Sequence, residues 1–92
     1  MISRDVIVPN RLGMHARAAA RFVHTAARFE SRVRVRRDAR VMDGKSIMGV
    51  LLLAASQGTT ITVSAEGADE QAAVESLVGL VESGFGEGSW NT

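Results

Sequence analysis

The stretch RLGMHARAAARFVHTAARF, which runs from Arg11 to Phe29, predicts a helix with a histidine directly before it. Apolar residues recur at helical spacing from Ala16 to about Phe29. These residues are Ala19, Phe22, Val23 and Ala26. His15 stands at the helix start, where Ser, Thr, Asp or Asn is the usual cap. An imidazole is therefore placed at the positive end of a helix dipole.

Strands are predicted on both sides of this helix. The segment Ile2–Val8 has an extended pattern that stops at Pro9, because proline lacks the N–H that a β-ladder needs. The segment SRVRVRR, Ser31–Arg37, alternates valine with arginine, which predicts a strand with one buried and one solvated face. After a turn near Asp38, a short strand is expected at Arg40–Met42.

Two more helices and one more strand are predicted in the second half of the chain. Ser46 is the expected N-cap of a short helix from Ile47 to about Ala54. Its expected core-facing residues are Val50, Leu53 and Ala54. A strand follows at Thr60–Ala65, and acidic residues from Asp69 to Glu75 mark the start of a third helix, whose dipole they complement. Gly84 suits the position after its end. Its expected buried face is Val74, Leu77, Leu80 and Val81.

The resulting order of elements is strand, helix, strand, strand, helix, strand, helix. This order predicts an α+β fold in which one four-stranded antiparallel sheet carries three helices on one face. The chain has 92 residues, enough for a single hydrophobic core. We therefore expect one domain at residues 1–85 and a flexible tail at residues 86–92.

Composition argues against several classes of function. The chain has no cysteine, so it has neither a disulfide framework nor a cysteine-based zinc site. Its longest apolar run, Ile47–Ala55, is too short to span a bilayer, and the N-terminus lacks an apolar signal region. We therefore expect a cytoplasmic protein without a membrane partner. The net charge of +1 disfavours a dedicated nucleic-acid-binding protein.

The residues around His15 suit the chemistry of phosphate. A helix start offers unpaired N–H groups and about half a positive charge, which favour an anion. Arg17, in the first turn, has the planar donor set that binds phosphate oxygens, and Gly13 permits a close approach of a partner. The alternative is that His15 is an unusual cap or an ordinary surface histidine.

Two further features indicate contact with other proteins. A basic stripe begins beside His15 and follows one face of the predicted helix, which suits an acidic partner or an ordinary solvated face. The stripe consists of Arg17, Arg21, His24 and Arg28. In the second helix Ile47, Met48 and Leu51 are expected to point partly outward, as a docking cluster or as part of the core. Phosphorylation of Ser46 would place a dianion at the helix start.

Three motifs in order resemble the histidine-containing phosphocarrier family HPr, of the phosphoenolpyruvate-dependent phosphotransferase system. They are LGMHARAAARF at 12–22, GKSIMGV at 44–50 and ITVSAEGADE at 61–70. The resemblance extends from Ile2 to about Phe85 and implies an open-faced β-sandwich. The family mostly has proline where this chain has Ala18, which implies a small loss of rigidity. Features similar to the nitrogen-related and the kinase-regulated branches are both present, which favours a regulatory phosphocarrier sensitive to an HPr kinase slightly over a carrier for sugar transport.

The resemblance also implies roles for individual residues. His15 would carry the phosphoryl group on Nδ1, Arg17 would stabilise it, and Ser46 would be phosphorylated by HPr kinase/phosphorylase. Enzyme I would donate the phosphoryl group and EIIA-type proteins would accept it. The chain would be a monomer that binds no cofactor and no metal, and a phosphoryl carrier rather than an independent turnover enzyme. The implied partner-binding surface is Ala16, Ala20, Arg21, His24, Ile47, Met48, Gly49 and Leu51.

Two rival functions are weighed against this interpretation. The first is a regulatory module that acts only through phosphorylated Ser46, without a relay at His15. The second is an RNA-binding domain that uses the arginines of Ser31–Arg37, but its strands would lack the aromatic residues on which bases stack. A metal site formed by His15 and His24 is disfavoured, because no carboxylate stands between them at ligand spacing.

Overall fold

A computed structural model describes residues 1–86 of the chain, and the element order is the predicted one. The elements are β1 (Ile2–Ile7), α1 (Ala16–Ala26), β2 (Arg32–Arg37), β3 (Arg40–Asp43), α2 (Ile47–Leu52), β4 (Thr60–Glu66) and α3 (Glu70–Glu82), followed by a 3₁₀ turn at Gly84–Gly86. All but the first residue of the tail expected at 86–92 lies outside the described residues.

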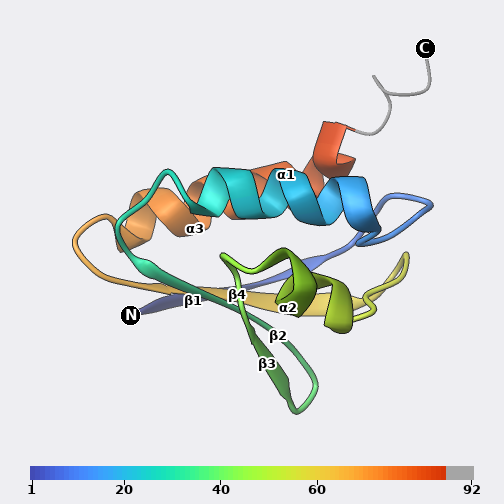
Figure 1. The fold of residues 1–92 in the computed structure, drawn as a ribbon, viewed down its shortest axis with the longest axis horizontal. Coiled ribbons are helices and arrows are strands. Elements are labelled where there is room, and N and C mark those ends of the chain that lie inside the picture. Colours follow the sequence, from blue (N-terminus) through green and yellow to red (C-terminus); the bar gives the residue numbers. More distant parts are fainter. Residues whose placement is uncertain (87–92) are drawn as a thin grey trace.

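The four strands form one antiparallel sheet in the order β1-β4-β2-β3. Helices α1 and α3 lie side by side across one face of this sheet, and α2 packs against α1 at the end where α1 begins (Figure 1). Within residues 1–86, no helix lies on the opposite face of the sheet (Figure 1). The predicted α+β fold, with its helices on one face of the sheet, is therefore confirmed.

The alternation of β2 decides which face of the sheet is covered. Val33 and Val35 are fully buried beneath the helices, whereas Arg32, Arg34 and the other outward side chains of the strand are exposed. Val35 pairs with Val63 of β4 in the register, which joins two buried side chains across the sheet. A strand with period-two alternation buries one face only, so the arginines are left on the open side.

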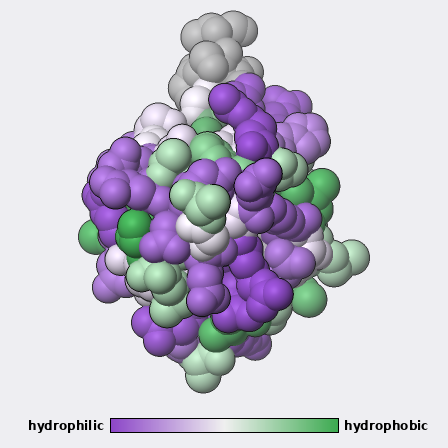
Figure 2. Space-filling model, turned by 90° about the vertical axis from the view of Figure 1, so that its left-hand side faces the viewer, coloured by the Kyte–Doolittle hydropathy of each residue, from purple (hydrophilic) through white to green (hydrophobic). Residues whose placement is uncertain are grey.

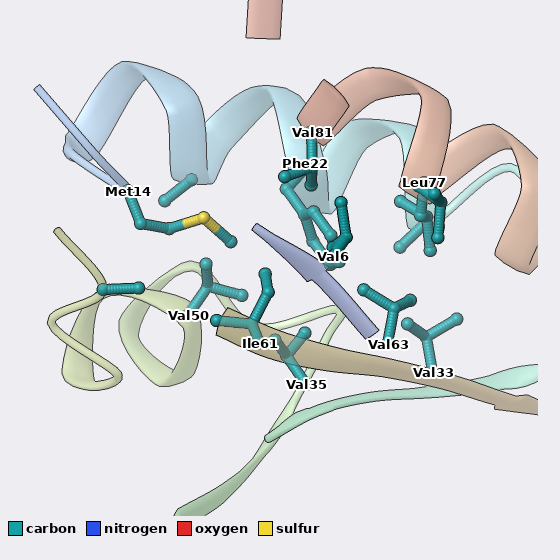
Figure 3. Packing of buried hydrophobic residues seen from close by; sticks show 14 of the residues in the cluster. Val6, Met14, Phe22, Val33, Val35, Val50, Ile61, Val63, Leu77 and Val81 are labelled. Carbon is teal, nitrogen blue, oxygen red and sulfur yellow. The ribbon is translucent and has the colours of Figure 1, made fainter. Parts of the chain in front are cut away.

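The core lies between the sheet and the helices (Figure 3). Val6, Ile61 and Val63 reach up from the strands, and Phe22 and Leu77 reach down from α1 and α3. Met14, from the loop before α1, and Val50, from α2, close the core at one end (Figure 3). The domain is small, so this single layer of apolar contacts supplies its stability.

Helix α1 ends at Ala26, three residues before the predicted end. The amides of Arg28 and Phe29 donate to the carbonyls of Thr25 and Ala26, at 3.1 Å each, so the chain tightens into a turn instead of continuing the helix. Such i-to-i−3 bonds are a common way to satisfy the last carbonyls of a helix.

Two predictions of core positions need correction. Ala54 is exposed, because α2 ends at Leu52 and the chain then enters a left-handed conformation at Ala54, with φ +52°. Ala55 is the buried residue that follows. In α3, Val74, Leu77 and Val81 are buried as expected, but Leu80 is only partly buried. Ala73 and Val78 complete that face instead.

Gly84 and Phe85 end α3 and anchor the chain that follows it. Gly84 follows the C-cap residue Ser83 and has φ +69°, which confirms its predicted place after the helix end. Phe85 is fully buried, also with a positive φ of 58°. The chain is therefore anchored to the core up to the last residues that the structure describes.

Candidate functional site

The loop before α1 is a tight turn that delivers His15 to the helix start. The side chain of the buried Asn10 donates from Nδ2 to the carbonyl of Gly13 (2.8 Å), and the amide of Gly13 donates back to the carbonyl of Asn10 (3.1 Å). Gly13 has φ +65°, a conformation that favours glycine. A Cβ at this position would lie 2.5 Å from the carbonyl oxygen of Ala55. Only glycine therefore fits here without a shift of the backbone.

Met14 ties the same loop to the segment after α2. Its amide donates to the carbonyl of Ala55 at 2.8 Å, and its side chain is buried in the core. The residue that follows, His15, is thus held between a buried anchor and the first turn of α1. A rigid position of this kind is needed where a side chain must meet a group on another protein in one orientation.

His15 occupies the N-cap position of α1, with extended backbone angles (φ −72°, ψ 178°). Its side chain makes no capping hydrogen bond, and its carbonyl accepts the first helical bond, from Ala19 at 2.8 Å. The amides of Ala16, Arg17 and Ala18 therefore precede the first helical hydrogen bond. The imidazole lies at the end of the helix where N–H groups point outward. The first turn contains no acidic residue that would compete for them.

The side chain of His15 is only partly accessible to solvent. The residue is half-buried, and its Nε2 atom is buried. Arg17, two positions later, is exposed, and Ala18 is fully buried against the core. The structure thus confirms the predicted placement of an imidazole and a guanidinium together at the start of one helix.

The predicted basic stripe follows the exposed face of α1 and continues into the turn after it, because α1 ends at Ala26 and Arg28 stands beyond that end. Its four residues, Arg17, Arg21, His24 and Arg28, are all exposed. The opposite face of the helix is buried, through Ala18, Ala19, Phe22, Val23 and Ala26. The helix is therefore strongly amphipathic, and the stripe begins beside His15.

Helix α2 presents the second predicted site. The Oγ atom of Ser46 accepts a hydrogen bond from the amide of Gly49 at 3.1 Å, which confirms Ser46 as the N-cap. Val50 is fully buried. Ile47 and Met48 are 41% and 67% exposed, as predicted for outward apolar residues, and Leu51 is half-buried against the core.

The two predicted sites lie on neighbouring elements. Helix α1 packs against α2, and the Met14–Ala55 bond joins the loop before α1 to the segment after α2. Ala16 is exposed and Ala20 half-buried on α1, and Gly49 is half-buried on α2. The residues predicted as a partner-binding surface thus stand on two helices that pack against each other.

Two exposed leucines on this side were not predicted. Leu12 is 63% exposed in the turn just before His15, and Leu52 is 54% exposed at the last residue of α2. Leu52 stands four residues after Met48, so the two share a side of the helix. The exposure of Leu52 cannot be predicted from the sequence, because residues 51–53 are all leucine and periodicity does not decide which of three identical residues faces the core.

The surface at the end of the molecule away from the start of α1 has no such group of exposed apolar side chains among the residues that the structure describes. Figure 2 shows that end, where hydrophilic residues predominate and hydrophobic ones are scattered. Among residues 1–86, no cluster of three or more potential metal-ligating side chains is found, and no helix has the length and hydropathy of a membrane span.

Comparison with known proteins identifies the family. Residues 2–83 match the family described as "PTS HPr component phosphorylation site". The phosphocarrier protein HPr of Cupriavidus necator is 47% identical over 96% of this chain and 99% of its own length. The chain belongs to the HPr family. HPr proteins are the phosphocarriers of the phosphotransferase system.

Solved structures of HPr proteins have the same fold. The crystal structure of HPr-C-His from Thermoanaerobacter tengcongensis superposes with a TM-score of 0.90 at 45% identity, over 94% of this chain and 97% of that one. The structure of an HPr dimer from the same organism has a TM-score of 0.74 at 45% identity, covering 92% and 98%. The open-faced β-sandwich expected from the HPr resemblance is therefore confirmed.

Proposed function

We propose that the chain accepts a phosphoryl group from Enzyme I on His15 and passes it to an EIIA-type protein. The single observation that carries this proposal is the position of His15, an imidazole held at the N-cap of α1 without serving as the cap. Membership of the HPr family supports the same conclusion.

The proposed reaction is an exchange between two imidazoles. A lone pair on a neutral ring nitrogen of His15 attacks the phosphorus, a new N–P bond forms, and the N–P bond to the donor's histidine breaks, returning its lone pair. We assign the reacting atom of this chain to Nδ1, because Nε2 is buried. No electrons are exchanged and no water is required, so exclusion of water by the docked partner protects the bond from hydrolysis.

The helix start would stabilise the transferred group. Phosphoryl oxygens on His15 would lie near the amides of Arg17 and Ala18, at the positive end of the α1 dipole. Arg17 is exposed and two residues away, so its guanidinium would reach the same oxygens. The protein would therefore supply position and charge, with no cofactor of its own.

We infer that both partners dock on the surface formed by α1 and α2. Ile47 and Met48 supply exposed apolar contacts, and on the neighbouring helix Arg21 supplies positive charge and His24 an exposed imidazole. Apolar contacts at the centre of an interface contribute most of its affinity, and charges at its rim select an acidic partner.

We propose that the chain acts as a cytoplasmic monomer.

Phosphorylation of Ser46 by HPr kinase/phosphorylase would regulate this docking. The Ser46 side chain already accepts a bond at the start of α2, so a phosphate there would remain favourable for the helix. The same dianion would lie beside Ile47 and Met48 and would repel an acidic partner. We therefore propose that phospho-Ser46 weakens docking without unfolding α2.

The test uses purified protein, Enzyme I and phosphoenolpyruvate, read by intact mass and phosphorus NMR. We expect a single acid-labile phosphoryl group on the wild-type chain and on His24→Ala, which removes an exposed histidine of the same helix. We expect none on His15→Ala. Transfer to the His15→Ala variant would refute the assignment of His15.

A different outcome would favour the regulatory module. If the wild-type chain accepts no phosphoryl group from Enzyme I but is phosphorylated on Ser46 by the ATP-dependent kinase, the relay proposal is wrong. Sedimentation of the same preparation at low and high concentration checks the monomer, and a dimer at low concentration would contradict it.

A further inference from the structure

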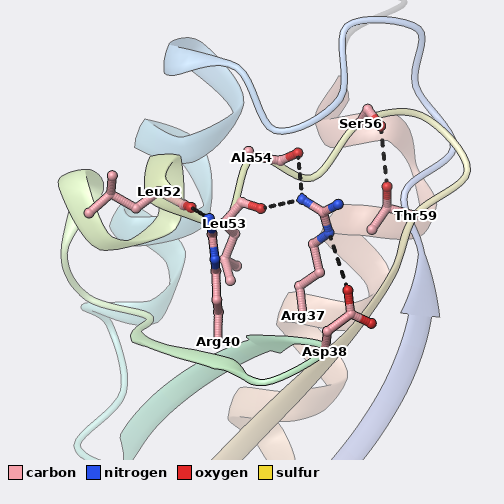
Figure 4. A network of polar contacts seen from close by, with 8 residues as sticks. All are labelled: Arg37, Asp38, Arg40, Leu52, Leu53, Ala54, Ser56 and Thr59. Carbon is pink, nitrogen blue, oxygen red and sulfur yellow. Dashed lines mark hydrogen bonds and ion pairs between the residues drawn. The ribbon is translucent and has the colours of Figure 1, made fainter.

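The C-terminal end of α2 is closed by side chains from a distant hairpin (Figure 4). Arg37, the last residue of β2, donates from Nη1 to the carbonyls of Leu53 (2.8 Å) and Ala54 (3.1 Å). Arg40, the first residue of β3, donates from Nη1 to the carbonyl of Leu52 (3.0 Å). Three consecutive carbonyls at the end of the helix thus receive guanidinium donors.

The two arginines are placed for this task by the sheet. Arg37 and Arg40 are directly paired in the register of β2 and β3, at the end of the hairpin. Asp38, between them, has φ +54°, so the turn is tight, and its carboxylate lies 4.0 Å from Nε of Arg37. The two guanidinium groups therefore reach α2 from one rigid turn.

Helix α2 needs such support more than the other helices do. It has six residues, far fewer than the roughly 12–15 at which a helix becomes even marginally stable by itself. It contains no basic residue in its last turn that could satisfy its own carbonyls. Guanidinium groups at this end complement the negative end of the helix dipole and supply the missing donors.

The same helix carries Ile47 and Met48 of the proposed docking surface, and we add Leu52 to that surface because it is exposed on the same side as Met48. Met48 and Leu52 are exposed on one side of it, and the carbonyl of Leu52 is the one that Arg40 binds. Buried contacts of Val50 and Leu53 hold the inner side of this segment, but they supply no donors to the carbonyls at the end of the helix, which bind Arg37 and Arg40 instead. The direction of the outer side chains therefore depends on how well that end is held.

We propose that Arg37 and Arg40 are positioning residues for partner docking: they hold α2 in the orientation that presents Met48 and Leu52 to the phosphotransfer partner. This inference rests on the proposed function, because it requires α2 to be the docking helix. The hydrogen bonds of both arginines go to carbonyls at the end of α2, not to the group that is transferred at His15. Their loss is therefore expected to change how well the partner binds and to leave the chemical step unchanged.

The test compares Arg37→Met/Arg40→Met with Arg34→Met. Methionine keeps the apolar stem and removes the donors, and Arg34 is an exposed arginine of the same strand whose side chain points to the open face of the sheet. With the chain as substrate of Enzyme I, we expect the double variant to raise KM about fivefold with kcat unchanged, because fewer molecules hold the docking conformation. Arg34→Met is expected to leave both constants unchanged.

Hydrogen exchange and a lysine variant complete the test. We expect exchange of the α2 amides to accelerate about tenfold in the double variant, with the amides of α1 and α3 unchanged. Arg37→Lys/Arg40→Lys should restore most of the loss in KM, because an ammonium group at either position is also a donor to carbonyls. A single Arg37→Met variant serves if the double variant does not fold.

The outcomes separate this inference from the proposed function. Transfer at an unchanged KM in the double variant, with or without faster exchange in α2, would overturn the positioning role and leave the phosphocarrier function intact. Equal effects of Arg34→Met would overturn it as well, because charge alone would then explain the result. Failure of the wild-type chain to accept a phosphoryl group would overturn both proposals.

Discussion

At the scale of single residues, the geometry before α1 depends on Gly13. Its positive φ and the nearby carbonyl of Ala55 leave no room for a side chain. Gly58 also has a positive φ, of 87°, but a Cβ there would meet nothing within 4 Å. Alanine substitutions at these two glycines can therefore distinguish the cost of backbone strain, which both share, from the cost of a steric clash, which only Gly13 has.

We predict that Gly13→Ala lowers the free energy of unfolding by about 2–3 kcal/mol and that Gly58→Ala lowers it by about 1 kcal/mol. A left-handed backbone costs a non-glycine residue about 1–2 kcal/mol at both positions, and only Gly13→Ala adds a steric clash. Urea denaturation measures both values. We also expect Gly13→Ala to slow phosphoryl transfer, since the loop carries His15. Equal losses of stability in the two variants would contradict the role of the Ala55 carbonyl.

Asp69 joins two loops at the other end of the molecule. Its carboxylate accepts bonds from the hydroxyl of Ser31 and from the amides of Ser31 (2.9 Å) and Glu30 (2.8 Å). The hydrogen bond from the Ser31 hydroxyl, followed by that from the Glu30 amide, holds the pKa of Asp69 below its ordinary value. The ionised form is therefore favoured in the folded state.

A lowered pKa makes stability depend on pH in a definite direction. The contribution of Asp69 is present above its unfolded pKa of about 3.9 and is lost as pH falls through the lower folded value. We predict that Asp69→Asn is less stable than wild type at pH 7 and that this difference shrinks below about pH 4. Melting temperatures from pH 7 to pH 2 test this, with the exposed Glu82→Gln as control. A difference that grows in acid would show that the sign is wrong.

At the scale of elements, the segment after α2 stores strain at Ala54. This residue has φ +52°, and its carbonyl is bound by Arg37. Ala39, in the neighbouring hairpin turn, is also exposed, but it has no positive φ. Glycine should therefore have opposite effects at these two alanines.

We predict that Ala54→Gly raises the free energy of unfolding by about 1 kcal/mol, because glycine adopts the left-handed region without strain. Ala39→Gly is expected to lower it by about 0.4–1 kcal/mol, since it only adds freedom to the unfolded chain. Chemical denaturation of both variants decides the matter. A loss of stability in Ala54→Gly would mean that the turn is not strained.

At the scale of the whole molecule, positive charge is concentrated although the net charge is only +1. The exposed face of α1 carries Arg17 and Arg21, and Arg28 follows in the turn after the helix, whereas acidic residues such as Glu70, Glu75 and Glu82 lie on α3. On the proposed function, such a local basic surface would steer an acidic partner toward His15, and salt would screen this steering.

We therefore predict that kcat/KM for transfer from Enzyme I falls about tenfold between low salt and 0.5 M salt. Arg28→Gln, in the turn after α1 and at the far end of the basic stripe from His15, is expected to reduce the salt dependence and leave kcat unchanged. Initial rates measured at several ionic strengths test this. A rate that does not respond to salt would mean that the basic face of α1 plays no part in association.

The pattern of residues predicted most of this fold. Alternating Val33 and Val35, the helical spacing around Phe22 and the cap at Ser46 are local signals, and the structure confirms each of them. The ends of α1 and α2 were placed too late, because helix ends depend on which carbonyls find other donors. The exposure of Ala54 followed from the same error.

The order of elements, the buried faces and the place of His15 before a helix can all be predicted from the amino-acid pattern, because each depends on the spacing of residues that are close in the chain. Other features follow only from the packing of the folded chain: Gly13 and Met14 fix the loop against Ala55, Leu12 and Leu52 are exposed, and Arg37 and Arg40 bind the end of α2. These contacts join residues that are distant in the chain or depend on a choice among equal neighbours. Local periodicity carries no information about such pairings, which packing alone establishes.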